Sequence, residues 1–298
     1  MELSPLEKAG ILIEALPYIQ QFYGKTVVIK YGGHAMTDPA LKQATIQDFI
    51  LMHLVGMHPV IVHGGGPEIS QLLARLGKKS EFIRGQRVTD AETMEIVEMV
   101  LVGKINKEIV ASIHRCGGKA IGVCGKDGHL IEAQKATEST CGPNGEEVIL
   151  DLGYVGRVER INPGIIETVI AQGYIPVVAP VGVGPEGESY NINADFVAGE
   201  LAVALKADKL VLLTDVPGIL ADRGDPSSLI SALEVGRVPE LIEKGVISGG
   251  MIPKVHCCVR ALEGGVGKTH IIDGRIPHSL LLEIFTDKGV GTMVVPGN

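Results

Sequence analysis

The sequence predicts an α/β protein, a three-layer αβα sandwich in which helices cover both faces of a mainly parallel central sheet. Apolar runs of strand length alternate with longer helix-like segments from residue 26 onward. Some of these runs are apolar at every position, such as Leu210–Leu213, which is typical of strands buried on both faces. Glycine-rich loops follow the first two strands, at the edge where parallel sheets bind ligands.

The spacing of apolar residues predicts each element in turn. An amphipathic helix is expected over residues 5–22, where apolar side chains recur near helical spacing. Strands are expected near 26–31, 58–63, 119–124, 174–179, 209–214, 269–273 and 292–295. Helices are expected near 39–55, 67–76, 90–115, 163–172, 193–206, 238–245, 252–263 and 278–285.

Two turn-rich stretches interrupt this alternation. Between residues 125 and 160, glycine and charged residues are frequent and apolar runs are short, which predicts hairpins that act as a cover or lid. A second stretch, residues 182–189, separates two α/β halves. We therefore expect two lobes, residues 1–184 and residues 185–298.

The composition narrows the class of protein. The 298 residues are 45% hydrophobic and 21% charged, which indicates a globular chain with a large core. A net charge of -8 without dense runs of Lys and Arg argues against nucleic acid as a partner. The five cysteines show no metal-site or redox spacing, which favours reduced thiols. With no apolar run of spanning length and no signal peptide expected, we predict a cytoplasmic protein without a membrane partner.

Two glycine loops predict a site for a phosphate chain. Residues 60–66 run from an apolar strand through His63 into three glycines, and Pro67 then begins a helix. Glycines allow backbone N–H groups to face a ligand, and the N-terminus of the helix carries partial positive charge. The preceding strand ends in Lys30 close to Gly32 and Gly33, which adds a fixed cation. A nucleotide is the simplest ligand for such a pair of loops.

Two other nucleotide motifs are not supported. The run Gly264–Thr269 resembles the end of a P-loop, but Leu262 stands where that motif needs glycine. The run also joins a helix to a strand, whereas a P-loop joins a strand to a helix. It is interpreted as a helix stop followed by a strand. No Gly-x-Gly-x-x-Gly begins the first helix, which disfavours a nicotinamide dehydrogenase.

Several charged and polar residues stand where packing does not require them. Asn191, Asn193 and Asp195 alternate before a helix, although one of them is enough to cap it. Lys254 lies on the first turn of a helix, where a cation opposes the helix dipole unless it meets an anion such as phosphate. Arg87 is suited to holding a carboxylate through two hydrogen bonds, although a surface ion pair is an alternative.

These residues lie in blocks that together resemble the amino acid kinase family over nearly the whole chain. The turn Thr214–Ile219, alone a common turn, is one part of the pattern. The run Arg87–Asp90 favours the branch of the family that acts on N-acetylglutamate. The six blocks occur in order at residues 28–33, 62–69, 85–90, 191–195, 212–220 and 249–254.

The resemblance implies ATP-dependent phosphorylation of the γ-carboxylate of N-acetyl-L-glutamate to N-acetyl-L-glutamyl 5-phosphate in arginine biosynthesis. The first lobe would bind the amino acid and the second ATP. Lys30 and Lys254 would stabilise the transferring phosphoryl group, and Asp195 would orient both lysines. The substrate would contact Gly65, Gly66, Arg87, Asn191 and Asn193. ATP would contact Gly32, Gly33, Asp215, Gly218, Ile219, Gly250 and Met251.

The implied reaction explains which chemical groups are expected. A carboxylate is already a nucleophile, so catalysis needs alignment and charge neutralisation rather than a general base. Magnesium would arrive with ATP and keep most of its waters, so no protein metal cage is expected.

The resemblance also implies regulation. The N-terminal helix resembles the extension of arginine-inhibited members, where it links dimers into a hexameric ring, a trimer of dimers. The segment from His270 through Glu283 resembles the arginine site of those members, so both residues are expected to contact arginine as a feedback inhibitor. The alternative is a packing helix and a core histidine. Some relatives bind a PII signalling protein, and the sequence leaves that partner open.

Three other functions compete with this one. A kinase of the same family could act on a different carboxylate or on carbamate. A catalytically inactive nucleotide or arginine sensor could keep the fold, although Lys30, Lys254 and Asp195 are all present. A nicotinamide dehydrogenase lacks its glycine fingerprint.

Overall fold

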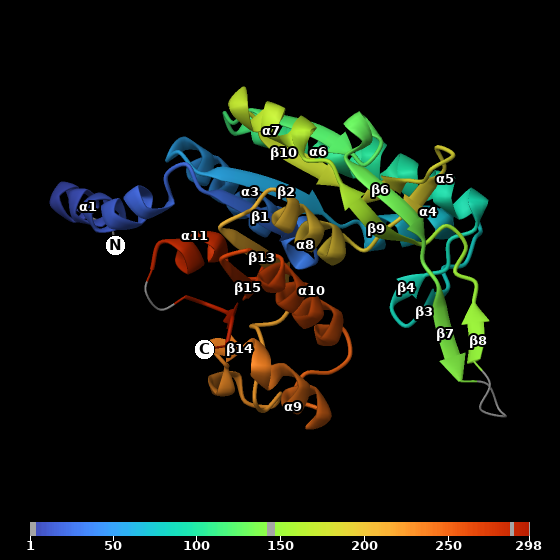
Figure 1. The fold of residues 1–298 in the computed structure, drawn as a ribbon. Coiled ribbons are helices and arrows are strands. Elements are labelled where there is room, and N and C mark those ends of the chain that lie inside the picture. The colour runs from blue at the N-terminus through green and yellow to red at the C-terminus, as the bar shows by residue number, and fades with distance from the viewer. Residues whose placement is uncertain (1–3, 142–146, 287–288, 298) are drawn as a thin grey trace.

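A single eight-stranded sheet runs through the molecule (Figure 1). The computed structural model describes residues 4–141, 147–286 and 289–297. The strand order is β14-β16-β15-β13-β1-β2-β10-β5, and every neighbouring pair is parallel except β15 and β16. The strands are β1 (Thr26–Tyr31), β2 (His58–His63), β5 (Ala120–Cys124), β10 (Ile175–Ala179), β13 (Lys209–Thr214), β14 (Ala232–Glu234), β15 (Lys268–Asp273) and β16 (Thr292–Val295). The predicted mainly parallel sheet is confirmed.

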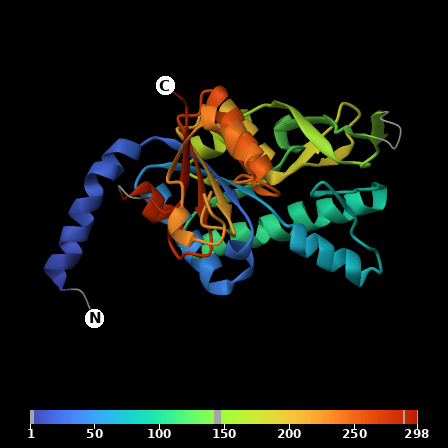
Figure 2. The ribbon, with the colours of Figure 1, turned by 90° about the horizontal axis from the view of Figure 1, so that it is seen from below.

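Helices cover both faces of this sheet and form two separate cores (Figure 2). Side chains alternate along a strand, so Val27 and Ile29 of β1 enter one core while Val28 enters the other. The first core is covered by α3 (Pro39–Leu54), α5 (Ala91–Glu98), η1 (Met99–Ile105), α6 (Asn106–Arg115) and α11 (Ser279–Ile284). The second is covered by α7 (Gly164–Ala171), α8 (Ala194–Ala204), α9 (Val238–Glu243) and α10 (Met251–Glu263). The predicted three-layer sandwich is therefore confirmed.

The helix expected over residues 90–115 is interrupted by a π-helical stretch. The seven residues of η1 lie between α5 and α6. Within that stretch Leu101 and Ile105 pack against the glycine loop, since a Cβ added to Gly65 would lie 2.4 Å from Ile105 and 2.6 Å from Leu101. Apolar spacing does not separate a π-turn from an α-turn, so the sequence analysis missed it.

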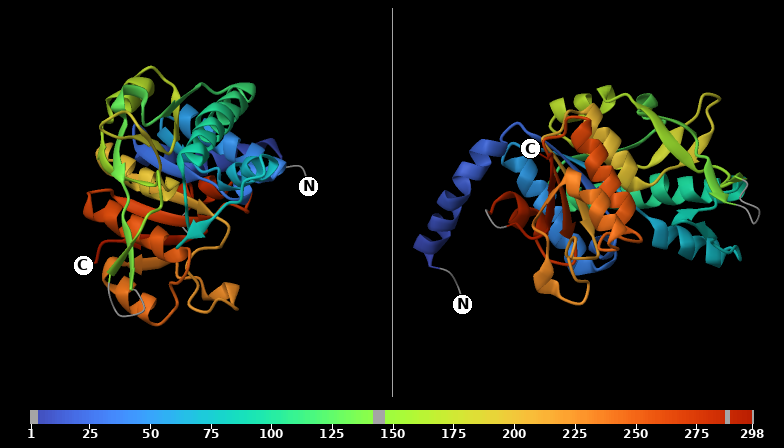
Figure 3. Two further views of the ribbon diagram at one scale, coloured as in Figure 1. Left: turned by 90° about the vertical axis from the view of Figure 1, so that its right-hand side faces the viewer. Right: turned by 60° about the horizontal axis from the view of Figure 1, so that its bottom comes forward.

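Smaller sheets lie beside the main one (Figure 3, left). One has the order β12-β11-β6-β9, and two hairpins pair β3 with β4 and β7 with β8. The antiparallel pairs β6–β9 and β7–β8 lie in the region of residues 125–160 where hairpins were expected, and their role as a lid stays a prediction. These strands are β3 (Phe82–Ile83), β4 (Gln86–Arg87), β6 (Ile131–Lys135), β7 (Glu138–Cys141), β8 (Glu147–Leu150), β9 (Gly156–Ile161), β11 (Val181–Val183) and β12 (Ser189–Asn191).

The stretch expected to separate two lobes forms the turn of the β11–β12 hairpin. Strands from before residue 184 occupy one half of the main sheet and strands from after residue 185 occupy the other. The two halves meet where β1 pairs with β13. The division into lobes stays a prediction, since one continuous sheet crosses it.

Some short elements were not expected from the sequence. They are too short to show a period, and neighbouring strands or loops hold them in place. They comprise α2 (His34–Thr37), β14, η2 (Asp127–His129), η3 (Pro226–Ser228) and η4 (Val235–Arg237). The remaining helix, α4 (Gly66–Arg75), begins directly after the glycine loop as expected.

Helix α1 (Pro5–Phe22) projects from the body of the molecule (Figure 3, right). It begins with a capping box in which Ser4 and Glu7 bond each other's backbone N–H groups. Its apolar side chains are largely uncovered, with Leu6, Leu12 and Ile13 exposed by 83%, 72% and 68%. Across the described ranges, no helix is both long enough and apolar enough to cross a membrane.

Candidate active site between two cavities

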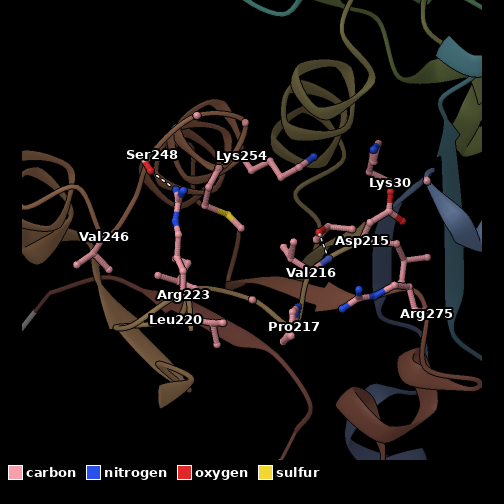
Figure 4. Close-up of a pocket in the computed structure, with 18 residues that line it drawn as sticks. Lys30, Asp215, Val216, Pro217, Leu220, Arg223, Val246, Ser248, Lys254 and Arg275 are labelled. Carbon is pink, nitrogen blue, oxygen red and sulfur yellow. Dashed lines mark hydrogen bonds between the residues drawn. The ribbon is translucent and has the colours of Figure 1, made fainter. Parts of the chain in front are cut away.

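Two cavities meet at the carboxyl ends of β1 and β13. One has a volume of about 680 Å³ and is shown in Figure 4; we call it the first cavity. The second cavity has a volume of about 450 Å³. Lys30, Gly33 and Asp215 line both cavities, so two ligands could meet at this point.

A buried carboxylate stands between two lysines at this junction. Asp195 is 5% exposed, and its Oδ2 lies 2.6 Å from Nζ of Lys254 while its Oδ1 lies 3.3 Å from Nζ of Lys30. Burial by itself would raise the pKa of Asp195, but the two ammonium groups together hold it below its ordinary value. The centre is therefore ionised at neutral pH and carries one surplus positive charge, which suits a polyanion.

Local structure brings these three groups together. Lys30 is the second-to-last residue of β1 in one half of the sheet, and Lys254 lies in the first turn of α10 in the other. Asp195 lies in the first turn of α8, where a carboxylate also meets the positive end of the helix. Its charge offsets the unfavourable position of Lys254 at a helix N-terminus. In Figure 4 the two lysine side chains extend toward the same region from opposite sides.

The two asparagines before α8 make different hydrogen bonds. Asn193 caps the helix, since its Oδ1 accepts a hydrogen bond from the N–H of Asp195 at 2.8 Å. Asn191 donates from Nδ2 to Oγ1 of Thr89 at 3.3 Å. Both asparagines line the second cavity. One residue is therefore enough to cap the helix, and the function expected for the other polar residues stays a prediction.

Arg87 is a buried cation without an acidic partner. Its guanidinium donates to Oγ of Ser80, to the carbonyl of Gly66 and to Oγ of Ser70 at 2.5, 2.9 and 2.8 Å, and it lies over the ring of Phe82. Burial lowers its pKa from the ordinary 12.5, which still leaves it charged at neutral pH. None of the described carboxylates forms an ion pair with it. A buried charge held this way favours an anionic ligand in the second cavity.

The rest of the second cavity combines backbone and apolar groups. The glycine loop Gly64–Gly66 forms one wall, beside Gly32 and Gly33. Apolar side chains of Leu101 and Val155 line it as well. The cavity therefore suits a small anion with an apolar part.

The first cavity is lined by the turn after β13 and the loop before α10. Asp215 accepts a hydrogen bond from the N–H of His34 at 2.7 Å, and a Cβ on Gly33 would lie 2.3 Å from the Asp215 carboxylate. Only glycine fits there, because its φ of +69° is also left-handed. The predicted nucleotide residues Gly33, Asp215, Gly218, Ile219, Gly250 and Met251 line this cavity, whereas Gly32 lines only the second.

Other residues of the first cavity were missed by the sequence analysis. Arg275 lines it and forms two hydrogen bonds from its guanidinium to Asp273, from Nε at 2.9 Å and from Nη2 at 2.8 Å. The signal was its place just after the end of β15, beside the other strand ends. Arg223 reaches across to Oγ of Ser248 (Figure 4), a contact between two loops that sequence spacing does not predict.

His270 and Glu283 line neither of these cavities. His270 donates from Nδ1 to Oε1 of Glu283 at 2.7 Å, and both side chains are buried. Nε2 of His270 is buried, with no hydrogen-bond partner among the described residues. The two residues predicted to share a site are thus in contact. Among the described residues, no group of three or more His, Cys, Asp and Glu side chains could hold a metal ion.

Sequence matches to known proteins extend over most or all of the chain. Residues 25–273 match the model of the amino acid kinase family. An acetylglutamate kinase of Moorella thermoacetica is 82% identical to the chain, and the alignment covers 100% of both. An acetylglutamate kinase of Heliobacterium modesticaldum is 69% identical over 98% of this chain and 99% of its own.

Solved structures share the fold. An N-acetylglutamate synthase from Neisseria gonorrhoeae, complexed with coenzyme A and N-acetyl-glutamate, has a TM-score of 0.82 at 25% identity over 97% of this chain. The chain spans 64% of that synthase. A carbamate kinase from Giardia lamblia bound to AMP-PNP has a TM-score of 0.64 at 17% identity and covers 92% of this chain and 99% of its own. At that identity the likeness is one of fold alone.

Asp195→Asn is expected to destabilise the protein in a pH-dependent way. Breaking a buried ion pair on one side costs about 3 kcal/mol. Because the pKa of Asp195 is lowered in the folded state, its contribution is complete above the ordinary value of 3.8 and decreases as the pH falls below it. Urea unfolding of both proteins at about pH 7, 5 and 3 measures the difference. A difference that does not shrink at the lowest pH would contradict the ion-pair assignment.

Proposed function

The chain belongs to the amino acid kinase family, and we infer from this membership and its site that it is an ATP-dependent kinase of N-acetyl-L-glutamate. It transfers a phosphoryl group from ATP to the γ-carboxylate of N-acetyl-L-glutamate, a step of arginine biosynthesis. The identity of 82% with an acetylglutamate kinase along the whole chain supports this reaction most directly. The pairing of Lys30, Asp195 and Lys254 where two cavities meet is the observation that carries the mechanism.

We propose that the lysines act on the transferring phosphoryl group. Negative charge spreads over its oxygens in the transition state, and two fixed ammonium groups offset that charge. Asp195 keeps the two cations close without repulsion, since its two oxygens each meet one lysine. No residue has to remove a proton, because the attacking carboxylate is already ionised.

We place the amino acid in the second cavity and ATP in the first. Arg87 lines the second cavity, forms no ion pair with a described carboxylate and would hold the α-carboxylate of the substrate, with Asn191 and Asn193 beside it. Gly65 and Gly66 would donate backbone N–H groups to the substrate. The larger first cavity, lined by residues from segments 215–220 and 248–254, suits a nucleotide.

Magnesium would accompany ATP rather than occupy a protein cage. Asp215 fits as a carboxylate near the metal, because it lines both cavities and its side chain is 42% exposed. The ion would supply further neutralisation of phosphate charge.

We also place the enzyme in the cytoplasm, which its use of ATP and the free thiols of Cys116, Cys124, Cys257 and Cys258 support.

A hydroxamate assay tests the reaction. Hydroxylamine traps an acyl phosphate, so ATP-dependent hydroxamate is expected with N-acetyl-L-glutamate and not with glutamate, aspartate or carbamate-forming mixtures. Signal with another acid would overturn the substrate. ATP binding without any signal would favour the alternative of an inactive sensor.

Lys254→Ala is expected to lower kcat far more than it changes KM for N-acetyl-L-glutamate. Loss of one charge that acts on the transition state costs about 100- to 1,000-fold in rate. Steady-state kinetics measure both constants. Lys244→Ala, whose lysine is exposed and pairs with Glu240, is the matched control and is expected to leave them unchanged. An equal or larger effect on KM would count against the role of Lys254.

Arg87→Ala is expected mainly to raise KM for N-acetyl-L-glutamate, by about 10-fold or more, because a charge-assisted bond to the substrate is lost. The KM for ATP is expected to stay close to the wild-type value. Arg75→Ala, with an exposed arginine in the last turn of α4, is the control. An unchanged KM for N-acetyl-L-glutamate would remove Arg87 from the substrate site.

We propose that arginine inhibits the enzyme at the His270–Glu283 pair. The buried Nε2 of His270 is an acceptor without a described partner, and the Glu283 carboxylate is a natural acceptor for a guanidinium. Helix α1 reaches this neighbourhood, since Lys209 of β13 lies over the ring of Phe22 at its end. These contacts support a site that links the N-terminal helix to β15.

Millimolar arginine is expected to inhibit the wild type, and Glu283→Gln is expected to need about 10-fold more arginine because a charged partner is lost. Initial rates at rising arginine measure the effect. Glu263→Gln, an exposed residue at the end of α10, serves as the control. Activity unaffected by arginine in the wild type would rule out the proposal.

We further propose that α1 packs against a second copy of the chain in a hexamer built from dimers. Its exposed Leu6, Leu12 and Ile13 support an apolar contact between copies. Sedimentation velocity is expected to show a hexamer for the wild type and dimers for a Leu12→Glu, Ile13→Glu variant. Glu14→Gln on the same helix is the control. A wild type that sediments as a dimer would contradict the role of α1.

A further inference from the structure

His63 is a fully buried histidine directly beneath the glycine loop. It ends β2 and precedes Gly64, and its exposed fraction is 0%. The reaction proposed above does not use it. Its ring contacts the carbonyl of Gly64 through Nδ1 at 2.9 Å and the side chain of Asn106 through Nε2 at 3.3 Å. The two contacts together decide which nitrogen carries the proton.

The orientation of the Asn106 amide is fixed from the other side. Lys107 has only donors, and its Nζ lies 3.1 Å from Oδ1 of Asn106. The Val177 carbonyl has only acceptors, and it lies 2.9 Å from Nδ2 of Asn106. Both contacts require that the Asn106 oxygen faces Lys107 and that its nitrogen faces Val177. The Nδ2 group, which also faces His63, therefore donates a hydrogen bond to the ring.

The proton of His63 therefore lies on Nδ1. Nε2 has to accept from Asn106, and a neutral imidazole then carries its hydrogen on Nδ1. That hydrogen is donated to the carbonyl oxygen of Gly64. An imidazolium could not accept at Nε2, and burial together with the charge of Lys107 lowers the pKa of His63 to about 4. The ring is neutral at physiological pH.

This bond determines where the next N–H points. In a trans peptide the carbonyl and the following N–H point in opposite directions, and none of the described peptides is cis. With the Gly64 carbonyl turned back to His63, the N–H of Gly65 is turned away from the ring. No described residue accepts a hydrogen bond from it, and Gly65 lines the second cavity.

Two further contacts hold the loop in this position. The N–H of Gly64 donates to the carbonyl of Tyr31 at 2.8 Å, which ties the loop to the end of β1. Leu101 and Ile105 of the π-helical stretch also pack against Gly65, where an added Cβ would lie 2.6 Å and 2.4 Å from their terminal methyl groups. These contacts hold the two ends of the loop. The bond from His63 to the Gly64 carbonyl then sets the plane of the Gly64–Gly65 peptide.

We propose that His63 is a positioning residue that, through its Nδ1–H, aims the N–H of Gly65 at the reacting carboxylate in the second cavity. The proposal rests on the function proposed above and adds a residue to its machinery. A preset N–H donor stabilises charge that develops in the transition state and does not reorganise during the reaction. Asn106 and Lys107 support His63 by fixing its tautomer, in the way that outer groups orient a functional side chain.

Two substitutions separate this role from simple packing. In His63→Asn the side-chain amide keeps a donor at the position of Nδ1, whereas in His63→Gln the amide reaches the position of Nε2 and leaves Gly64 without a donor. We expect His63→Gln to lose about 100-fold in kcat, as for a lost donor to the transition state, with KM for ATP unchanged. His63→Asn is expected to retain at least about ten times more of kcat than His63→Gln. Equal losses, or a larger loss in His63→Asn, would overturn the proposal.

His114→Asn is the matched control. The ring of His114 also bonds backbone, since its Nε2 accepts from the N–H of Ala120 at 3.0 Å, but it lines neither cavity. We expect this variant to lower the midpoint of thermal unfolding and to leave kcat unchanged. His114 is exposed, so a loss of kcat here equal to that of His63→Gln would show that removing any histidine that bonds backbone has the same effect, and would overturn the special role of His63.

The tautomer can be measured without any substrate. In protein labelled with 15N at its nine histidines, the His63 signals are identified by their absence in His63→Asn. If that variant does not fold, transfer of magnetisation from the ring protons to the backbone of His63 assigns them instead. A proton on Nδ1 and a bare Nε2 support the proposal, whereas a proton on Nε2 overturns it. A wild type with the Nδ1 proton but without hydroxamate activity would contradict the proposed function and not the loop arrangement.

Discussion

The ion pairs of Asp195 with Lys30 and Lys254 are the interaction on which the site depends. Two ammonium groups a few ångströms apart repel each other, and burial makes that repulsion stronger. A single ionised carboxylate between them offsets this repulsion, and the three groups together keep one net positive charge that can attract an anionic ligand. Because the three residues come from β1, α8 and α10, the same contact ties the two halves of the sheet at its ligand-binding edge.

Most of the other features prepare this edge for anions. Parallel strands place their carboxyl ends together, so the glycine loop after β2, the lysine of β1 and the turn after β13 become neighbours. Backbone N–H groups and buried cations would replace water around such ligands, and contacts within the protein set the directions of these groups. That arrangement suits phosphoryl transfer to a carboxylate, where positioning and charge account for most of the catalysis.

Strand β15 connects two regions of the molecule. His270 in its middle contacts Glu283 of α11, while Asp273 at its end holds Arg275 beside the first cavity. The same strand pairs with β13, whose Lys209 contacts the end of α1. A ligand at His270 would therefore lie on a strand whose end is next to the first cavity. The adjacent strands β13 and β15 therefore link helix α1, the buried His270–Glu283 pair and the first cavity.

The sequence by itself determined the layered fold and most residues of the candidate site. Continuous apolar runs, glycine loops at strand ends and charges in unfavourable positions depend on local chemistry, so Lys30, Asp195, Lys254 and Arg87 could be recognised one at a time. Short elements such as α2 and β14 could not be recognised, because too few residues carry their pattern. The position of β14 depends on β16, with which it pairs, and that of α2 depends on its contact with α3.

Only the tertiary structure decided which groups meet. The contact of His63 with Asn106 joins residues 43 positions apart, and it requires β2, α6 and a π-helical stretch that periodicity does not indicate. The place of Arg275 in the first cavity depends on the order of strands in the sheet, which no local pattern specifies. Residue chemistry is local and can be recognised in the sequence, whereas the direction of a hydrogen bond is set by packing between distant segments.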